Sequence, residues 1–259
     1  MDSQNTELPV SCAPSEQPPT RFTILAQDPS YIAIDKPSGF HVHQPEYPQR
    51  RVSRDIVCLA LLRNQIGQYV YPVHRLDVGT SGILLFALSS ESASKFGKAF
   101  SENRSHKTYY AVVRGYLKED KARIEIPLES DSTGELYNAI TDYEVISKVE
   151  LPFAVGKRHA TSRYSLVKVN PVTGRFHQIR RHFARLSHPI VGDCEHGDSH
   201  HNRFFREQLG IKGLMLRASA LQIDEPAIQI NLNSVWPDNW MRMFEKTGLS
   251  LSNSQCQQL

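Results

Sequence analysis

Residues 74–77, His-Arg-Leu-Asp, place two basic side chains and one carboxylate within four positions of the chain. A carboxylate can act as a nucleophile or as a general base, and an arginine beside it favours the ionised form. Apolar, strand-forming residues flank the motif at 69–73 and 83–87, with a bend of glycine, threonine and serine between them. This pattern predicts strand, loop and strand, so Asp77 is expected on a loop that sheet strands hold on both sides. Taken alone, such a motif is more often a surface loop with an Arg75–Asp77 pair.

Other polar groups along the chain could act together with this carboxylate. Tyr109 lies in a predicted strand, and Gly192-Asp193 follows a His-Pro-Ile-Val segment. Between Arg175 and His188 the chain has four arginines, three histidines and no acidic residue. Such a block is a candidate surface for contacting phosphates, although it could equally be a solvated helix face.

The segment from Cys194 to His201 contains cysteine, glutamate, aspartate and histidine, which are residue types that bind metal ions. Its spacing fits no zinc pattern, and no distant second cluster completes a site. We therefore expect a polar loop at the rim of a cleft, and no metal ion.

The elements expected to position these groups form one α+β domain dominated by antiparallel strands. Apolar residues at helical spacing predict helices at 54–66, capped by Ser53, at 91–100, capped by Ser90, and at 175–186 and 238–246. β-branched and aromatic runs predict strands at 22–25, 31–34, 69–73, 83–87, 107–114, 123–128, 141–149, 162–169, 214–216, 218–223 and 227–232. Residues 36–39 and 171–174 are expected to be turns.

The composition is that of an ordinary soluble globular protein, with 40% hydrophobic and 22% charged residues among 259. We expect one folded domain at residues 21–248, a disordered tail at 1–20 and a flexible tail at 249–259. No apolar run approaches the roughly 20 residues that span a bilayer, and no secretory signal is apparent. The four cysteines form no C-x-x-C pair, which predicts reduced thiols in a cytoplasmic protein. We expect a monomer, with no protein partner evident from the sequence.

Five segments of the chain resemble the signature motifs of the RluA-type pseudouridine synthases. They follow the order of that family between about residues 24 and 240. The segments are residues 35–39 (DKPSG), 74–77 (HRLD), 107–109 (KTY), 173–180 (TGRFHQIR) and 188–193 (HPIVGD). Further stretches, such as residues 192–198 and 215–219, look most like the branch of the family that isomerises uridine 65 in the T-stem of tRNA.

The resemblance implies a long, bent, mostly antiparallel mixed sheet flanked by helices and loops, with the site in a basic cleft. It also implies a reaction that cleaves the C1′–N1 bond of uridine, turns the bound uracil and joins C5 to C1′. No redox or phosphoryl-transfer step occurs, so no cofactor or metal is expected. A base paired in a stem must be flipped out before an enzyme can reach it.

The same resemblance assigns roles to individual residues. Asp77 is the expected catalytic carboxylate, Arg180 its basic partner, and Tyr109 the aromatic that stacks on uracil and could remove the C5 proton. Arg75 is expected to enter the base stack or hold the displaced strand, and Ile179 to pack under the flipped base. The other residues expected to contact RNA are His74, Arg175, His177 and Gln178.

Several of these residues also have an ordinary structural explanation. A strand tyrosine such as Tyr109 is usually part of a core. Arg175 and His177 could join the start of a helix to the sheet rather than bind RNA. His182, Arg185 and His188 are expected to be solvated or to face phosphates.

Three other functions remain open from the sequence. The RNA could be ribosomal, because sister branches of the family share every catalytic motif. The chain could be an RNA-binding protein without activity, although such a protein has no need for the carboxylate. A metal-dependent hydrolase that uses the histidine-rich segment is the third alternative.

Overall fold

The computed structural model describes residues 21–45, 51–156, 159–225 and 228–251. The tail expected at residues 1–20 and most of the one expected at 249–259 lie outside this range. None of the helices in the described part of the chain has the length and apolar character needed to cross a bilayer.

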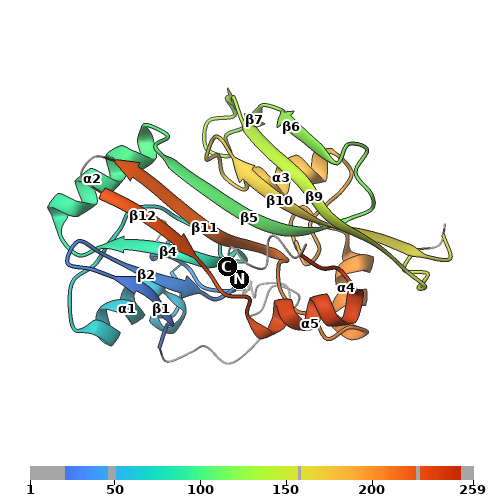
Figure 1. The fold of residues 1–259 in the computed structure, drawn as a ribbon, viewed down its shortest axis with the longest axis horizontal. Helices are drawn as coiled ribbons and strands as arrows, with labels where there is room; N and C mark the ends of the chain where they lie inside the picture. Colours follow the sequence, from blue (N-terminus) through green and yellow to red (C-terminus); the bar gives the residue numbers. More distant parts are fainter. Residues whose placement is uncertain (1–20, 46–50, 157–158, 226–227, 252–259) are drawn as a thin grey trace, which may run out of the picture.

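Within the described residues, ten strands form one mixed sheet in the order β1-β2-β4-β11-β5-β10-β9-β6, with β3 also paired to β4 and β12 to β11 (Figure 1). Every pairing is antiparallel except that of β4 with β11. The expected α+β fold with a mostly antiparallel mixed sheet is therefore confirmed. The strands are β1 (Ile24–Gln27), β2 (Tyr31–Lys36), β3 (Tyr71–Pro72), β4 (Ser81–Ala87), β5 (Ser105–Arg114), β6 (Lys121–Glu125), β9 (Ile140–Leu151), β10 (Ser162–Pro171), β11 (Leu216–Glu225) and β12 (Ile228–Asn233).

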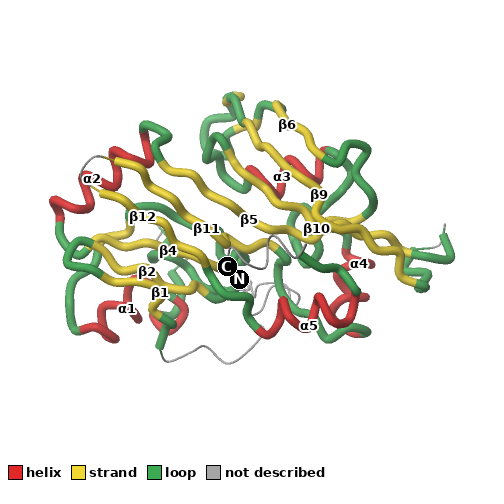
Figure 2. The backbone as a smooth tube through the Cα atoms, in the orientation of Figure 1, coloured by secondary structure: helices red, strands yellow, loops and turns green. Residues whose placement is uncertain are grey.

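The sheet bends, so that β6 and β9 run at an angle to β1, β2 and β4 (Figure 2). Irregular registers interrupt the ladder between Leu166 and Val167 of β10 and between Ala218 and Ala220 of β11. Such bulges increase local twist and bend the strand that carries them. A separate hairpin of β7 (Leu128–Glu129) and β8 (Leu136–Tyr137), not expected from the sequence, adds a small second sheet.

Five α-helices and one short 3₁₀ helix lie in the described residues. They are η3 (Arg54–Ile56), α1 (Cys58–Ile66), α2 (Ser90–Ser101), α3 (Gln178–Arg185), α4 (Ser199–Glu207) and α5 (Asp238–Thr247). In Figure 1, α1 and α2 lie at the left of the sheet and α4 and α5 at the lower right, while α3 lies against the half with β9 and β10. The expected caps are each slightly displaced. Ser53 precedes η3 instead of α1, and Ser89, one residue before Ser90, accepts the hydrogen bond that caps α2.

The sequence missed helix α4, since the segment up to His201 was expected to be a loop. Asp198 caps this helix by accepting hydrogen bonds from the backbone N–H groups of His200 and His201. Its buried apolar residues are the adjacent Phe204 and Phe205, which give no repeating helical pattern in the sequence.

Strand β4, which follows the Asp77 loop, is buried along its whole length. Its residues alternate between two cores, because successive strand side chains point to opposite faces. Leu84 and Phe86 join the larger core, and Ile83 and Leu85 join the smaller one. The C-terminal side of the loop is therefore anchored from both faces of the sheet.

The two cysteines in the described residues differ in state. Cys58 is a buried free thiol, as expected. Cys194 is disulfide-bonded, so the expectation of reduced thiols is wrong for this position. Sequence spacing alone cannot say which distant cysteines meet in the fold.

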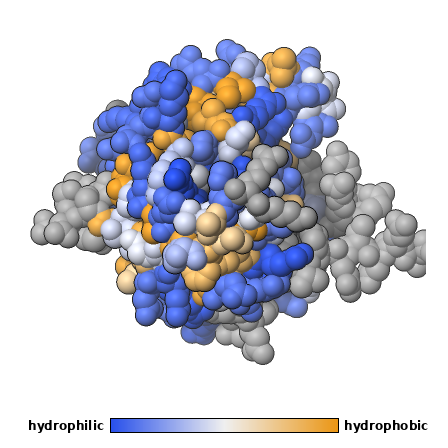
Figure 3. Space-filling view, turned by 90° about the vertical axis from the view of Figure 1, so that its right-hand side faces the viewer, coloured by the Kyte–Doolittle hydropathy of each residue, from blue (hydrophilic) through white to orange (hydrophobic). Residues whose placement is uncertain are grey.

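Seen from the right-hand side of Figure 1, the surface is mostly hydrophilic, with apolar residues in separate patches (Figure 3).

Candidate active site

All of the predicted site residues line one cavity of about 500 Å³. They are Asp77, Tyr109, Arg180, His74, Arg75, Arg175, His177, Gln178 and Ile179. The sheet order explains why residues so distant in sequence meet. The neighbouring strands β4, β11, β5 and β10 bring together the loop before β4, the middle of β5 and the helix after β10.

The buried ammonium group of Lys36 holds the Asp77 loop, residues 74–80 between β3 and β4, in place. Its Nζ donates hydrogen bonds to the carbonyl oxygens of Pro37 (3.1 Å), Val78 (3.0 Å) and Thr80 (2.8 Å). Burial lowers the pKa of Lys36 to about 8. An ammonium group has three donors, and all three are engaged here. The turn at residues 36–39 is thus structural, as expected, and it holds the loop that presents the carboxylate.

Gly82 allows the end of this loop to enter the sheet. Its φ is 109°, and a Cβ atom at this position would lie 2.0 Å from the carbonyl oxygen of Ala218 in β11. Only glycine fits such an approach, because it has no Cβ and tolerates positive φ. The parallel pairing of β4 with β11 therefore depends on this residue.

The Asp77 carboxylate lies in the cavity wall, with its side chain 20% exposed. Its Oδ2 is 3.7 Å from Nη1 of Arg180 and 4.0 Å from Nε2 of His177. Burial raises the pKa of Asp77, while the charges of Arg180, Arg75 and Lys36 oppose the rise. The arginines favour the ionised form, as the sequence predicts, but burial is the larger effect.

Arg180 is held in place by acidic residues on the opposite side from Asp77. Its Nε and Nη2 donate to the two carboxylate oxygens of Asp193 at 2.7 and 2.8 Å, and Nη2 also lies 3.2 Å from Glu195. Burial works against the charge on Arg180, but the hydrogen bonds and charge of Asp193 outweigh it and raise the pKa of the guanidinium. A two-point pair of this kind fixes orientation as well as charge. The role of the Gly192-Asp193 segment is therefore to aim Arg180 at Asp77.

His177 sits at the start of α3 in a left-handed backbone conformation, with φ of 50°. Its ring stacks on Phe176, with ring centres 3.7 Å apart, and its Nδ1 lies 3.1 Å from Nε2 of His196. Burial and the nearby Arg180 lower the pKa of His177 to about 4, so the ring is neutral near pH 7. A neutral His177 can share a proton with His196 while its Nε2 faces Asp77.

One group among the described residues has the composition of a metal site. Ligand atoms of His177, Glu195 and His196 all lie within 4.8 Å of one another. It takes only two residues from the segment that the sequence singled out as metal-capable. Glu195 also contacts Arg180, whose positive charge opposes a cation there. A hydrogen-bonded histidine pair accounts for the geometry.

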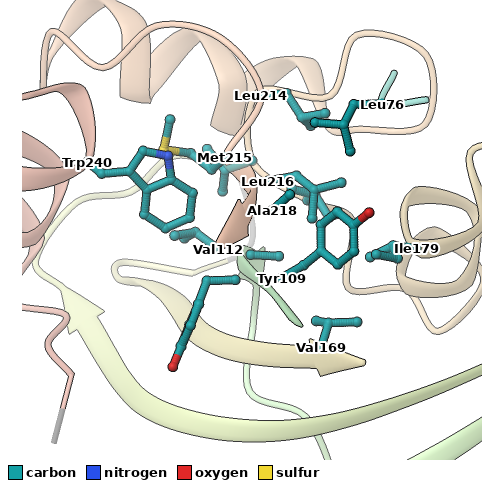
Figure 4. Packing of buried hydrophobic residues seen from close by; sticks show 14 of the residues in the cluster. Leu76, Tyr109, Val112, Val169, Ile179, Leu214, Met215, Leu216, Ala218 and Trp240 are labelled. Carbon is teal, nitrogen blue, oxygen red and sulfur yellow. The ribbon is translucent and has the colours of Figure 1, made fainter. Parts of the chain in front are cut away.

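Tyr109 lies in β5, opposite Ala218 of β11 and Val169 of β10. Its ring packs among apolar side chains that include Ile179, and its hydroxyl points to the side where Leu76 and Ile179 lie (Figure 4). Burial, together with the negative charge of Asp77, raises the pKa of the phenol. Tyr109 is therefore a neutral phenol, which can accept a proton only if it passes its own proton on.

His74 and Gln178 line the cavity but also have structural hydrogen bonds. The Nε2 of His74 accepts from the backbone N–H of Leu85, so its Nδ1 carries the proton, and that atom is buried without a partner among the described residues. Burial lowers the pKa of His74 to about 3. Gln178 donates to Ile140 O and Thr141 Oγ1, which ties α3 to β9. Contact of either residue with RNA remains a prediction.

Of the three residues expected to be solvated or to face phosphates, His182 is buried. It bonds to Thr141 Oγ1 (2.9 Å) and to the carbonyl oxygen of Ile126 (3.0 Å), so the expectation is wrong for this residue. Arg185 is exposed and donates to the carbonyl oxygen of Pro127. Residues 180–182 are three consecutive basic residues, and their types alone do not show which of them are buried.

Sequence reasoning missed two residues that shape the cavity. The sequence predicts a turn at Lys36 but not the contacts of its side chain. A lysine directly after a predicted strand and before Pro-Ser-Gly is a usable signal of such a buried contact. Phe176 belongs to the motif at residues 173–180, but the sequence assigns it no role. An apolar residue inside an otherwise basic block is a usable signal of a contact surface.

Comparison with known proteins places these residues in a family context. Residues 30–185 match the family model described as RNA pseudouridylate synthase. The chain is 39% identical over 239 residues to the tRNA pseudouridine synthase C of Vibrio parahaemolyticus, covering 88% of this chain and 96% of that one. It is 42% identical to the Vibrio cholerae protein of that name (82% and 92% covered) and 44% identical to the Pasteurella multocida protein (80% and 87%).

Two solved structures have the same fold. Human RNA Pseudouridylate Synthase Domain Containing 1 superposes with a TM-score of 0.71 at 24% identity, covering 94% of this chain and 96% of that one. Human RNA Pseudouridylate Synthase Domain Containing 4 gives 0.69 at 23% identity, covering 89% and 95%.

Proposed function

The chain belongs to the RNA pseudouridylate synthase family, and we propose that its substrate is tRNA, at uridine 65 of the T-stem. Membership of the family confirms the resemblance drawn from the sequence, and the protein is a pseudouridine synthase. The tRNA assignment is supported by the names of relatives that are 39–44% identical over most of the chain. The position within tRNA is supported by the branch-like segments of the sequence.

The observation that carries the proposal is the setting of Asp77. The Asp77 carboxylate lies in the wall of a cavity of about 500 Å³, 3.7 Å from Nη1 of Arg180. Arg180 is itself held by hydrogen bonds to Asp193. Arg180 is buried and the Asp77 side chain is 20% exposed, so electrostatic effects between them exceed those in water. A group with a shifted pKa beside a specific charge partner in a cavity is a candidate catalytic residue.

We propose that the target uridine is flipped out of its stem into this cavity. The ionised Asp77 then acts at the sugar, either as the nucleophile at C1′ or as the base that removes a sugar proton. The positive charge of Arg180 favours the ionised carboxylate and opposes the effect of burial. Both routes detach uracil from C1′ at N1, and the ring turns and rejoins through C5.

The cavity walls offer the turning uracil an aromatic and an apolar surface. Tyr109 provides a ring that can stack on uracil, and Ile179 packs beside it. After C5 has joined C1′, the C5 proton must leave and N1 must gain one; the Tyr109 hydroxyl can relay the C5 proton to water, which in turn can protonate N1. Arg75, exposed beside Asp77, is placed to fill the stack or to hold the displaced strand.

None of these steps transfers electrons or phosphate, so we expect turnover without a cofactor or added metal. We also expect the protein to act in the cytoplasm. We expect His74, Arg175, His177 and Gln178 to contact the RNA, directly or through the elements that they hold.

The experiment is release of tritium from RNA labelled at uridine C5, with tRNA and ribosomal RNA supplied separately and a chelator present. Release from tRNA alone, with pseudouridine mapped to position 65, is the expected result. Release from ribosomal RNA alone would refute the substrate assignment and retain the chemistry. Release only when metal is restored would contradict the cofactor-free mechanism.

A further inference from the structure

A second cavity, of about 970 Å³, adjoins the first. The two share four lining residues: Arg75, Gly174, Arg175 and Phe176. The far wall of the second cavity is the β7–β8 hairpin and the turn between its strands. The two cavities therefore offer adjoining surfaces, one for a uridine and one on which a neighbouring nucleotide can lie.

Two exposed aromatic rings line this second cavity. Phe176 is 45% exposed and Tyr137 is 38% exposed. An arginine lies over each ring: Arg75 at 6.0 Å from the Phe176 centroid and Arg175 at 5.3 Å from that of Tyr137. Arginine and aromatic planes are the surfaces on which proteins stack unpaired bases.

The Phe176 ring has one face available to a ligand. The His177 ring covers the other face at 3.7 Å, with 20° between the planes. Arg75 lies farther away, with its guanidinium carbon 6.0 Å from the ring centre, and its side chain is exposed and can move to admit a base. The His177 contact holds the phenylalanine ring in a fixed orientation.

The charges in this cavity are mixed, with three arginines and two acidic residues in its lining. Arg181 donates to the carbonyl oxygen of Glu129 at 2.9 Å and lies 4.0 Å from the carboxylate of Asp131. Arg175 donates through Nε to the carbonyl oxygen of Asn138. The hairpin thus holds both arginines in place beside the exposed aromatic rings, and its carboxylates offset part of their positive charge.

We propose that the second cavity is a subsite for an unpaired base next to the target uridine, with the base stacked on Phe176 and Tyr137 lining the far side. This inference rests on the proposed function, because it requires an RNA substrate whose uridine enters the first cavity. It identifies Phe176 as a residue that binds substrate without taking part in the chemistry.

The test compares Phe176→Ala and Phe176→Leu with the wild-type protein on three RNAs. One RNA is an intact T-stem-loop, and the other two lack the base on the 5′ or the 3′ side of the target uridine. Phe176→Leu keeps apolar volume and removes the aromatic face. Phe153→Ala is the matched control, because Phe153 is also 45% exposed and lines neither cavity.

On intact RNA, both Phe176 variants should raise KM and the dissociation constant by about 5- to 100-fold, with kcat nearly unchanged. On one of the two abasic RNAs, wild type and variants should bind equally, because the base that stacks is gone. Phe153→Ala should match wild type on all three RNAs.

A Phe176 variant that matches Phe153→Ala on intact RNA would overturn the proposal. So would a loss of equal size on all three RNAs, because it would show that the ring supports the site and does not contact a base. Dissociation constants require no turnover. A wild-type protein that binds these RNAs without releasing tritium would therefore count against the proposed function and leave the subsite test intact.

Discussion

The reactivity of Asp77 depends on opposing effects at a single side chain. Burial raises the pKa of the carboxyl group, and the charges of Arg180, Arg75 and Lys36 hold it down. Asp193 keeps Arg180 in position beside Asp77 by accepting hydrogen bonds from Nε and Nη2 of the guanidinium. The carboxylate is thus poorly solvated and lies beside fixed positive charges that favour its ionised form, a combination suited to a nucleophile or a base.

Activity should fall as the pH drops and Asp77 takes up a proton. Because the pKa is raised, the midpoint of this fall in kcat/KM should lie above about 3.9, the value of an ordinary aspartate. Arg75→Ala removes a positive charge that favours the ionised form, so the midpoint should move to higher pH. Arg185→Ala, an exposed residue outside the cavity, should leave it in place. A midpoint that moves down, or not at all, in Arg75→Ala would contradict this account.

Tyr109→Phe tests whether the phenol hydroxyl relays the C5 proton. The ring still stacks, so KM should change little. Loss of the relay should lower kcat by about 100-fold or more. Tyr143→Phe, buried but outside the cavity, should keep its kcat. A fully active Tyr109→Phe would restrict Tyr109 to stacking.

At the level of elements, the sequence predicted most of the strands and helices that frame the site. Residues 83–87 and 107–114 carry strong β patterns and form β4 and β5. The short helix α4 was missed, because two adjacent phenylalanines are its only buried residues. Side-chain partners such as that of His182 were also missed. Such contacts join residues 41 and 56 positions apart and leave no local pattern.

The close approach of β4 to β11 makes a clear prediction for Gly82. Gly82→Ala would place Cβ 2.0 Å from Ala218 O at a φ of 109°, so it should destabilise the fold by about 3 kcal/mol or more. Gly97→Ala is the control, because this position lies inside α2 with nothing within 4 Å of the added Cβ. It should raise stability by roughly 0.5–1 kcal/mol. Urea unfolding measures both, and equal stabilities would contradict the packing described.

Lys36→Met tests the support beneath the Asp77 loop. It would leave the carbonyl groups of Val78 and Thr80 buried without their donor, at a cost of roughly 3 kcal/mol. Because the loop would also lose its fixed position, kcat should fall more than KM rises. The exposed Lys118→Met serves as control. A Lys36→Met protein as stable and active as this control would show that the ammonium group is dispensable.

At the scale of the whole molecule, the site depends on the complete sheet, because its residues come from strands and loops that meet only when the sheet has formed. The loop before β4, the middle of β5 and the helix after β10 meet because β11, from late in the chain, pairs between β4 and β5. The motifs identified which residues matter, but the sequence offers no local signal for this strand order. The same architecture recurs in a human structure at only 24% identity, so the fold itself tolerates extensive change in sequence.

RNA binding and catalysis should also depend on different parts of the molecule. The arginines and aromatic rings that we propose to contact RNA line two adjoining cavities, whereas the proposed bond-breaking step depends on the carboxylate of Asp77. Removing that carboxylate should therefore abolish the reaction and leave binding in place.

The most direct test measures Asp77→Asn for both tRNA affinity and pseudouridine formation, beside the exposed control Asp224→Asn. We predict that Asp77→Asn binds tRNA within about three-fold of wild type and forms product at least about 10⁴-fold more slowly. The control should bind and react as wild type does. Product formation by Asp77→Asn at a wild-type rate would contradict the assignment of Asp77 as the catalytic group.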